Sequence, residues 1–189
     1  MTSLDALQAA LGPRYEIARE LGRGGWATVY LAVDRKHERP VAIKLFHPAL
    51  AASLGTGRFL QEIRLVAQFQ HPYIIPLHDS GETDDSLYFV MPYVAGESLR
   101  QRLEREGRLS VAETLAIAGD VAAALDYAHA RGVVHRDIKP ENVLLAGGHA
   151  FVADFGIALA VRAATGEVSV ADGRPSTSGA PFRASGGGP

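Results

Sequence analysis

The 189-residue sequence contains no cysteine, which excludes a disulfide framework and a thiolate metal site and is typical of a reducing compartment. It also lacks an apolar run of about 18 residues, the length that a membrane-spanning helix needs. The first residues carry no basic stretch ahead of an apolar one, so a secretory signal is not expected. Together these absences predict a cytoplasmic protein with no membrane segment.

Lysine is scarce as well: among 19 basic residues, only Lys36, Lys44 and Lys139 are lysines. Arginine otherwise carries the positive charge, so each retained lysine invites a specific explanation. The formal net charge is −2, which gives no indication of a surface for nucleic acid or anionic lipid. A hydrophobic content of 47% is sufficient for the core of one domain or of two small lobes.

The most informative stretch covers residues 133–145 and reads VVHRDIKPENVLL. Apolar residues at both ends predict two short strands that present the polar loop between them. Within the loop, Lys139 lies between Asp137 and Asn142. A carboxylate can accept a hydroxyl proton, an amide oxygen can bind Mg²⁺, and an ammonium can neutralise a phosphate. These residue types indicate phosphoryl transfer, in which the protein supplies mainly position and charge.

A second group of motifs lies in the first half of the chain. Between strands predicted at 15–21 and 28–34, Gly22 and Gly24 would let the backbone approach phosphate oxygens closely. In the strand predicted at 40–46, alternation puts Ala42 and Lys44 on one face, and an inward lysine requires an anion. An ordinary tight hairpin would explain the glycines alone, but their combination with Lys44 favours a phosphate site.

A carboxylate partner for Lys44 is expected on the next element. Residues 58–70 predict a helix in which Glu62 borders the apolar stripe and can reach a lysine on the sheet. Without Lys44, a solvated glutamate would be the preferred interpretation. With it, an ion pair is expected.

Turn, capping and periodicity signals predict the remaining elements. They are a leading helix over 3–11, strands over 74–79 and 86–91, a hinge at 91–97, and helices over 97–107 and 110–131. In the last helix, the apolar positions that predict a core face are Leu115, Ala118, Val121, Ala122, Leu125 and Ala128. Residues 150–156, AFVADFG, predict a short strand that delivers Asp154 into a turn, where it is expected to share a metal with Asn142.

The order and spacing of these motifs resemble the eukaryotic-like (Hanks-type) bacterial serine/threonine protein kinases, over roughly residues 15 to 165. The matching segments are the glycine loop Gly22–Val29, VAIK ending at Lys44, Glu62, HRD at 135–137, Asn142, and DFG at 154–156. Lys139 in HRDIKPEN is similar to the serine/threonine branch rather than the tyrosine branch.

The resemblance implies an α+β, two-lobed, protein-kinase-like fold. A five-stranded N-lobe with one main helix would precede an incomplete, mainly helical C-lobe. The implied organisation is a leader at 1–14, the N-lobe at 15–90, a hinge at 91–97, a partial C-lobe at 98–166 and a disordered tail at 167–189.

The resemblance also implies a role for each motif residue. The catalytic and phosphate-holding set is Asp137, which would orient the substrate hydroxyl and accept its proton, Lys139, Lys44, and Glu62, which would hold Lys44. The metal set for Mg²⁺ is Asn142 and Asp154. The ATP-binding set is Leu21, Gly22, Gly24, Val29, Ala42, Lys44, Met91, Val94 and Leu144.

The implied reaction is transfer of the γ-phosphate of Mg-ATP to a serine or threonine hydroxyl of a protein substrate, with autophosphorylation as a further reaction. The alternative is a catalytically impaired ATP-binding kinase fragment or pseudokinase-like scaffold. A small-molecule kinase is disfavoured by Lys139 and its loop.

One departure from the family pattern follows the DFG motif. The family continues with an activation loop, an A-P-E-type motif and several helices, whereas only residues 157–189 follow here. Residues 171–189 are rich in glycine, serine, proline and alanine, a composition that cannot bury enough apolar surface to order itself. The sequence therefore predicts a kinase truncated after the DFG motif, with part of its C-lobe core left exposed.

Overall fold

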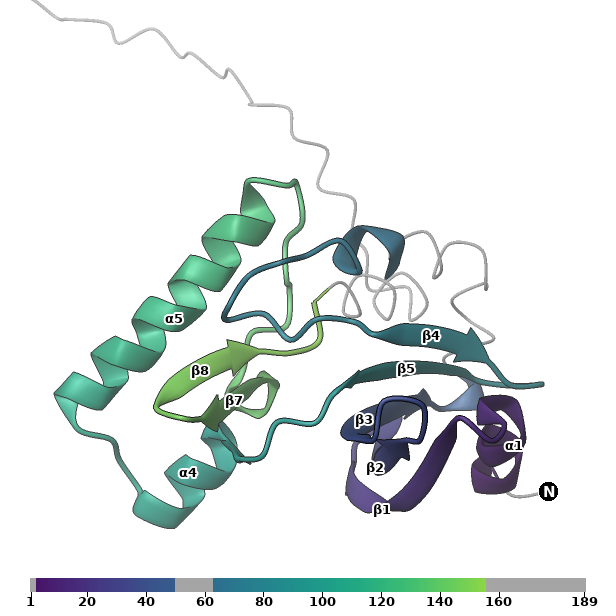
Figure 1. The fold of residues 1–189 in the computed structure, drawn as a ribbon. Helices are drawn as coiled ribbons and strands as arrows, with labels where there is room; N and C mark the ends of the chain where they lie inside the picture. Colours follow the sequence, from purple (N-terminus) through teal and green to yellow (C-terminus); the bar gives the residue numbers. More distant parts are fainter. Residues whose placement is uncertain (1–2, 50–62, 156–189) are drawn as a thin grey trace, which may run out of the picture.

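The computed structural model describes residues 3–49 and 63–155, which form two lobes joined by a connection at residues 93–96 (Figure 1). The first lobe contains α1 (Ser3–Leu11), β1 (Tyr15–Arg23), β2 (Ala27–Asp34), β3 (Arg39–Phe46), β4 (Asp79–Glu82) and β5 (Leu87–Pro92). The second contains β6 (Glu97–Ser98), α4 (Leu99–Glu106), α5 (Val111–His129), the 3-10 helix η1 (Pro140–Asn142), β7 (Val143–Ala146) and β8 (His149–Val152).

The first lobe is built on one antiparallel sheet of five strands in the order β1-β2-β3-β5-β4. Alternation along β3 directs Val41 and Ile43 into the core, whereas Ala42 and Lys44 face the other side of the sheet. The core cluster consists of Leu7, Leu11, Tyr15, Tyr30, Ala32, Val41, Ile43, Leu45 and Val90. The sheet thus keeps one face for packing and leaves the face of Lys44 for other partners.

The predicted leading helix is present as α1, and it belongs to this core. Leu7 is fully buried among the strands. Gln8 extends the attachment, because its amide nitrogen donates to the Tyr15 carbonyl at 3.0 Å and its oxygen accepts from the Ile17 N–H at 3.4 Å. The helix therefore packs on the sheet through both apolar and backbone-directed contacts.

In the second lobe, α5 packs through its C-terminal half. It begins at a capping box in which Ser110 and Glu113 bond each other's backbone N–H groups. The buried residues of the helix are Ala124 and Ala128, which join a cluster with Phe69, Ile74, Val152 and Phe155. The antiparallel three-stranded sheet β6-β7-β8 lies beside this helix (Figure 1).

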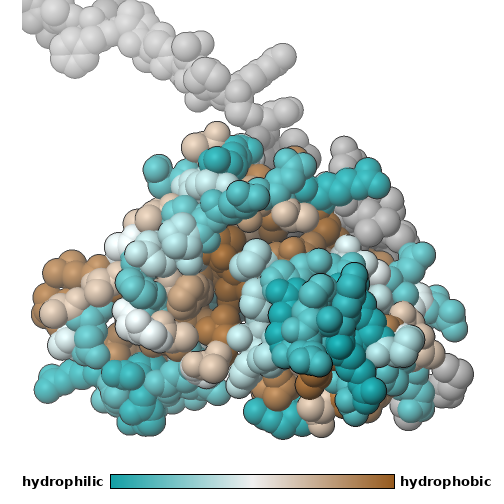
Figure 2. All heavy atoms as spheres, in the orientation of Figure 1, coloured by the Kyte–Doolittle hydropathy of each residue, from teal (hydrophilic) through white to brown (hydrophobic). Residues whose placement is uncertain are grey.

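The predicted core face of α5 is therefore only partly buried, in agreement with the expectation that part of the C-lobe core is left exposed. Leu115 is 67% exposed, and Ala118 and Ala122 are also exposed. Val111, one turn earlier, is 77% exposed, and Figure 2 shows apolar surface at the end of the molecule where α5 begins. Helical spacing identifies which residues share a face, but among the described residues the packing partners of α5 reach only its later turns.

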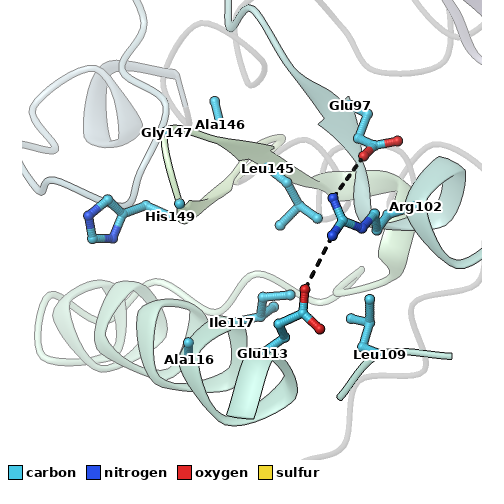
Figure 3. A pocket seen from close by; sticks show the side chains of 11 residues that line it. Glu97, Arg102, Leu109, Glu113, Ala116, Ile117, Leu145, Ala146, Gly147 and His149 are labelled. Atoms are coloured by element: carbon cyan, nitrogen blue, oxygen red, sulfur yellow. Dashed lines mark hydrogen bonds and ion pairs between the residues drawn. The ribbon is translucent and has the colours of Figure 1, made fainter. Parts of the chain in front are cut away.

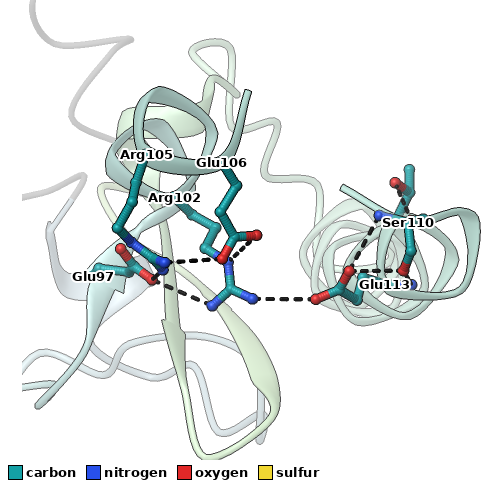
Figure 4. Close-up of polar contacts among 7 residues, drawn as sticks. Glu97, Arg102, Arg105, Glu106, Ser110 and Glu113 are labelled. Atoms are coloured by element: carbon teal, nitrogen blue, oxygen red, sulfur yellow. Dashed lines mark hydrogen bonds and ion pairs between the residues drawn. The ribbon is translucent and has the colours of Figure 1, made fainter. Parts of the chain in front are cut away.

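A network of ion pairs fixes the first turn of α5 against α4 (Figure 4). The Arg102 guanidinium contacts Glu97 at 3.4 Å, Glu106 at 2.9 Å and Glu113 at 3.2 Å, so one side chain joins β6, α4 and α5. Beside it lies a cavity of about 290 Å³, whose apolar wall includes Ile117 and Leu145 (Figure 3). These half-exposed pairs contribute less to stability than to the orientation of the helices.

The strand predicted at 74–79 is wrong: β4 occupies Asp79–Glu82 instead. The backbone of residues 73–75, which precedes β4, forms hydrogen bonds with the second lobe. The Ile75 N–H donates to the Val152 carbonyl at 3.0 Å, and the Val152 N–H donates to the Tyr73 carbonyl at 2.8 Å. Ile74 forms a parallel bridge with Val152. These backbone groups connect the two lobes instead of forming a strand. The local pattern of apolar residues does not indicate this, because it carries no information about a partner far away in the sequence.

Gly96 lies where the connection between the lobes passes β7, and this close approach gives the first prediction. A Cβ at Gly96 would overlap the carbonyl oxygen of Leu145, a backbone atom. We expect Gly96→Ala to destabilise the fold by about 1–3 kcal/mol, measured by urea unfolding. The control is Gly119→Ala on the exposed surface of α5, where a Cβ meets nothing within 4 Å; it should stabilise by up to about 1 kcal/mol. Equal unfolding midpoints for Gly96→Ala and the wild type would contradict the close approach.

Candidate active site

His135 anchors the polar loop between α5 and β7. It is 1% exposed, its Nε2 donates to the Ala153 carbonyl at 2.8 Å, and its Nδ1 accepts the Asp137 N–H at 3.3 Å. These two bonds require the neutral tautomer that carries its proton on Nε2. Burial also lowers the pKa of His135. The ring meets Phe155 edge-on at a centroid distance of 4.7 Å, so the loop is tied to the segment after β8.

Sequence reasoning assigned His135 no structural role. The sequence feature that could indicate such a role is its position two residues before Asp137. Spacing alone does not show that the ring is buried. The neighbouring Arg136 has a φ of 67°, a left-handed conformation that a non-glycine residue rarely adopts. This turn follows the buried anchor and precedes Asp137.

Asp137 is held by two groups from its own loop. Its Oδ2 lies 2.7 Å from the Lys139 Nζ and accepts from the Asn142 Nδ2 at 3.1 Å. The same amide nitrogen donates to the Asp137 carbonyl at 2.8 Å. The carboxylate side chain remains 44% exposed, so it is oriented yet accessible. Because the Asn142 amide donates to Asp137 through nitrogen, its oxygen is the atom left for a cation.

Lys44 and Asp154 join the two lobes through an ion pair. Their Nζ and Oδ2 atoms are 2.5 Å apart, and the side chains are 15% and 21% exposed. Asp154 has a φ of 65°, which turns the chain directly after Ala153. The predicted partner Glu62 lies outside the described residues, so its pairing with Lys44 stays a prediction. Among the described residues, the carboxylate that pairs with Lys44 is that of Asp154.

The face of the sheet that carries Lys44 also carries other predicted binding residues. In the antiparallel register Val29 lies opposite Lys44 and Ala42 lies opposite Met91, so these four side chains share one face. The others are half-buried. Leu21 lies beside a register shift of β1, Val94 lies in the connection between the lobes, and Leu144 lies on β7 of the second sheet.

The glycine loop, Gly22–Val29, provides a test of whether ATP fits here. None of Gly22, Gly24 and Gly25 has a positive φ, and the nearest atom to an added Cβ is the Ala27 carbonyl oxygen, 3.8 Å from Gly24. Neither backbone conformation nor crowding within the chain therefore requires glycine. A phosphate that approaches the backbone closely would require it, which fits a nucleotide.

The donor set also fits Mg²⁺, which prefers oxygen ligands and retains ligands from phosphates and water. Asp154 offers a carboxylate and Asn142 an amide oxygen, and the Ala153 N–H donates to the Asn142 carbonyl at 2.9 Å. Within residues 3–49 and 63–155, no cluster of three or more His, Cys, Asp or Glu side chains could hold a metal. Two protein ligands supplemented by phosphate oxygens are consistent with that composition.

Comparison with known proteins settles the family, because the family model described as protein kinase domain matches residues 15–175. The chain belongs to the protein kinase family. It is 41% identical over 157 residues to the probable serine/threonine-protein kinase pknA2 of Bifidobacterium longum, covering 80% of this chain and 21% of that protein. It is 43% identical over 151 residues to the serine/threonine-protein kinase PknD of Mycobacterium tuberculosis, covering 79% and 23%.

The crystal structure of the Mycobacterium tuberculosis PknI kinase domain is similar to this kinase chain, with a TM-score of 0.68 and 39% identity. The match covers 77% of this chain and 60% of that domain. The predicted family and the two-lobed α+β fold are therefore confirmed. In the part of the chain that the structure describes, no helix is long and apolar enough to cross a membrane. The predicted tail at 167–189 lies outside the described residues.

The low pKa of His135 gives a prediction about acid stability. The unfolded chain takes up a proton at this ring near pH 6.5, whereas the folded chain resists it. The stability that the neutral ring contributes is thus complete above that pH and is lost as pH falls below it. His135→Asn cannot titrate, so its unfolding midpoint in urea should fall less than that of the wild type between about pH 7.5 and 5.5. An identical pH dependence would contradict the buried neutral ring, since the other histidines are common to both proteins.

Proposed function

We propose that this chain is an ATP-dependent protein serine/threonine kinase. It transfers the γ-phosphate of Mg-ATP to a serine or threonine hydroxyl of a protein substrate, and its own hydroxyls are candidate acceptors. ATP is a nucleotide of the cell interior, and a sequence without cysteine is typical of a reducing compartment. The proposed reaction therefore takes place in the cytoplasm.

One observation carries the proposal: an unbroken series of contacts connects the phosphate-type lysine to the catalytic-type loop. Lys44 pairs with Asp154, whose neighbour Ala153 bonds both His135 and Asn142. Asn142 in turn bonds Asp137, which pairs with Lys139. Residues separated by most of the sequence are thereby held in one site, and each is of the type that phosphoryl transfer needs.

Different residues of the chain would bind different parts of the nucleotide. Lys44 holds the α- and β-phosphates, the backbone at Gly22 and Gly24 lies along them, and Glu62 holds Lys44 when the two meet. The adenine site is formed by Leu21, Val29, Ala42, Met91, Val94 and Leu144. Bound Mg-ATP supplies the phosphoryl group and a metal charge, with Asn142 and Asp154 as the protein ligands for the metal.

The substrate side of the site is the accessible carboxylate of Asp137. It orients the incoming hydroxyl and accepts its proton, while Lys139 neutralises the phosphate that is being transferred. The contacts of Asp137 with Lys139 and Asn142 hold its carboxylate in one orientation. Orientation by both groups reduces the motion that must be lost when the hydroxyl arrives.

The Lys44–Asp154 pair suggests how the site keeps its charges balanced. The two half-buried groups neutralise each other without ligand. If Mg-ATP were bound, Lys44 would hold a phosphate and Asp154 would hold the metal. Neither charge is left unpaired in either state, so the cost of burying them is limited.

The second candidate is an ATP-binding chain that transfers phosphate poorly. The residues proposed for the nucleotide all lie within the matched residues 15–175, whereas the match covers 60% of the PknI kinase domain. Both candidates use the same nucleotide residues, and only phosphoryl transfer separates them.

The decisive experiment measures transfer and binding in the same variants. Asp137→Asn keeps the shape of the side chain but removes its capacity to accept a proton. We expect transfer to a generic protein substrate to fall by about a hundred- to ten-thousand-fold. Mg-ATP binding, followed through Trp26, the single tryptophan, should change little. If the wild type binds Mg-ATP without measurable transfer, the second candidate is favoured. If it neither binds Mg-ATP nor transfers phosphate, both candidates are rejected.

A lysine variant tests the nucleotide site itself. Lys44→Met removes the charge that meets the phosphates, so we expect Mg-ATP binding to weaken at least about tenfold. The matched control is Lys36→Met, at an exposed position in the turn after β2. Titration of Trp26 fluorescence measures both. Equal dissociation constants for the two variants would contradict the assignment of Lys44.

A further inference from the structure

We infer that His47, the residue after β3, is a positioning residue that holds the tip of the glycine loop over the phosphate site. It contacts three residues of that loop. Its backbone N–H donates to the Trp26 carbonyl at 2.9 Å, its Nδ1 lies 3.1 Å from the Gly25 carbonyl, and its Nε2 lies 3.3 Å from the Thr28 hydroxyl. The inference rests on the proposed function, because it gives the loop a phosphate to bind.

The polarity of these contacts is determined by the chemistry of the partners. The Gly25 carbonyl can only accept, so Nδ1 carries the proton. In the neutral ring Nε2 then accepts, and the Thr28 hydroxyl donates to it. If the ring is protonated, the hydroxyl can rotate and accept instead. Both ring contacts therefore persist in either charge state of His47.

Thr28 is the rigid partner in its contact with the His47 ring. It is 3% exposed and lies opposite Leu45 in the β2–β3 register. A buried hydroxyl needs a hydrogen-bond partner, and the His47 ring supplies one. The ring thus connects a rigid, buried position on β2 to the exposed tip at Gly25.

The tip needs such a restraint because glycine has no side chain to pack. Gly24 closes the turn through a 2.8 Å bond from its N–H to the Ala27 carbonyl, but this bond lies within the loop and does not fix where the loop sits. His47 fixes the loop relative to β3, the strand that carries Lys44. The loop backbone and the lysine are thus held at a set separation, as two groups that bind one chain of phosphates require.

The test compares His47→Ala, which removes both ring contacts, with His47→Asn, whose amide nitrogen can replace Nδ1 as the donor to Gly25. Thr28→Val removes the other contact while keeping the side-chain shape. The control is His149→Ala, because His149 is a histidine with an exposed side chain and lies on β8, in the other lobe.

Trp26 reports the restraint directly, without nucleotide, since it lies in the loop and is 52% exposed. In His47→Ala we expect faster acrylamide quenching and lower fluorescence anisotropy of Trp26, both partly restored by His47→Asn. The variant should still unfold cooperatively in urea, with a lower midpoint because the buried Thr28 hydroxyl loses its partner. His149→Ala should match the wild type. Unchanged quenching in His47→Ala would overturn the inference, and if that variant does not fold, Thr28→Val decides by the same measurement.

Nucleotide binding provides the second readout. The dissociation constant for Mg-ATP, or KM for ATP where transfer is measurable, should rise about 3- to 10-fold in His47→Ala with little change in kcat. A mobile tip with unchanged affinity would refute a positioning role. Failure of the wild type to bind Mg-ATP would instead refute the proposed function, while the quenching data would still show whether His47 restrains the loop.

Discussion

The ion pair between Lys44 and Asp154 is the contact on which the candidate site depends. The two residues are 110 positions apart and belong to different lobes, so their 2.5 Å contact requires the lobes to be correctly placed. Backbone bonds between residues 73–75 and Val152 provide that placement, because Asp154 follows two residues later. A charged pair is costly to bury unless its geometry is good. Here the junction supplies the geometry of the pair, which in the proposed function becomes the position for phosphate and metal.

The rest of the site is organised around two histidine side chains. His135 is buried and uncharged, and it bonds both the loop of Asp137 and the segment of Asp154. The loop that carries the exposed charges of Asp137 and Lys139 is therefore held by His135, whose own charge does not change near neutral pH. His47 has the corresponding place in the first lobe, where it connects the glycine loop to β3. The charged groups can then exchange partners while their backbones stay in place.

The membership in the protein kinase family and the local geometry support the proposed function in different ways. The match over residues 15–175 assigns the family, whereas the contacts from Lys44 to Lys139 make the assignment of individual roles physically reasonable. The exposed apolar residues Val111 and Leu115 belong to neither argument. They lie at the start of α5, and Figure 1 shows this end of the helix far from β3, the strand that contains Lys44.

The sequence by itself determined the family, the order of the motifs and the faces of single elements. Alternation along β3 separated Ala42 and Lys44 from Val41 and Ile43, because strand periodicity is a local property. The tertiary structure decided which distant groups meet. It gave Lys44 the carboxylate of Asp154, used the backbone of residues 73–75 for the junction instead of a strand, and left Leu115 exposed. Spacing fixes the direction of a side chain, but its partner depends on contacts between segments that are far apart in the chain.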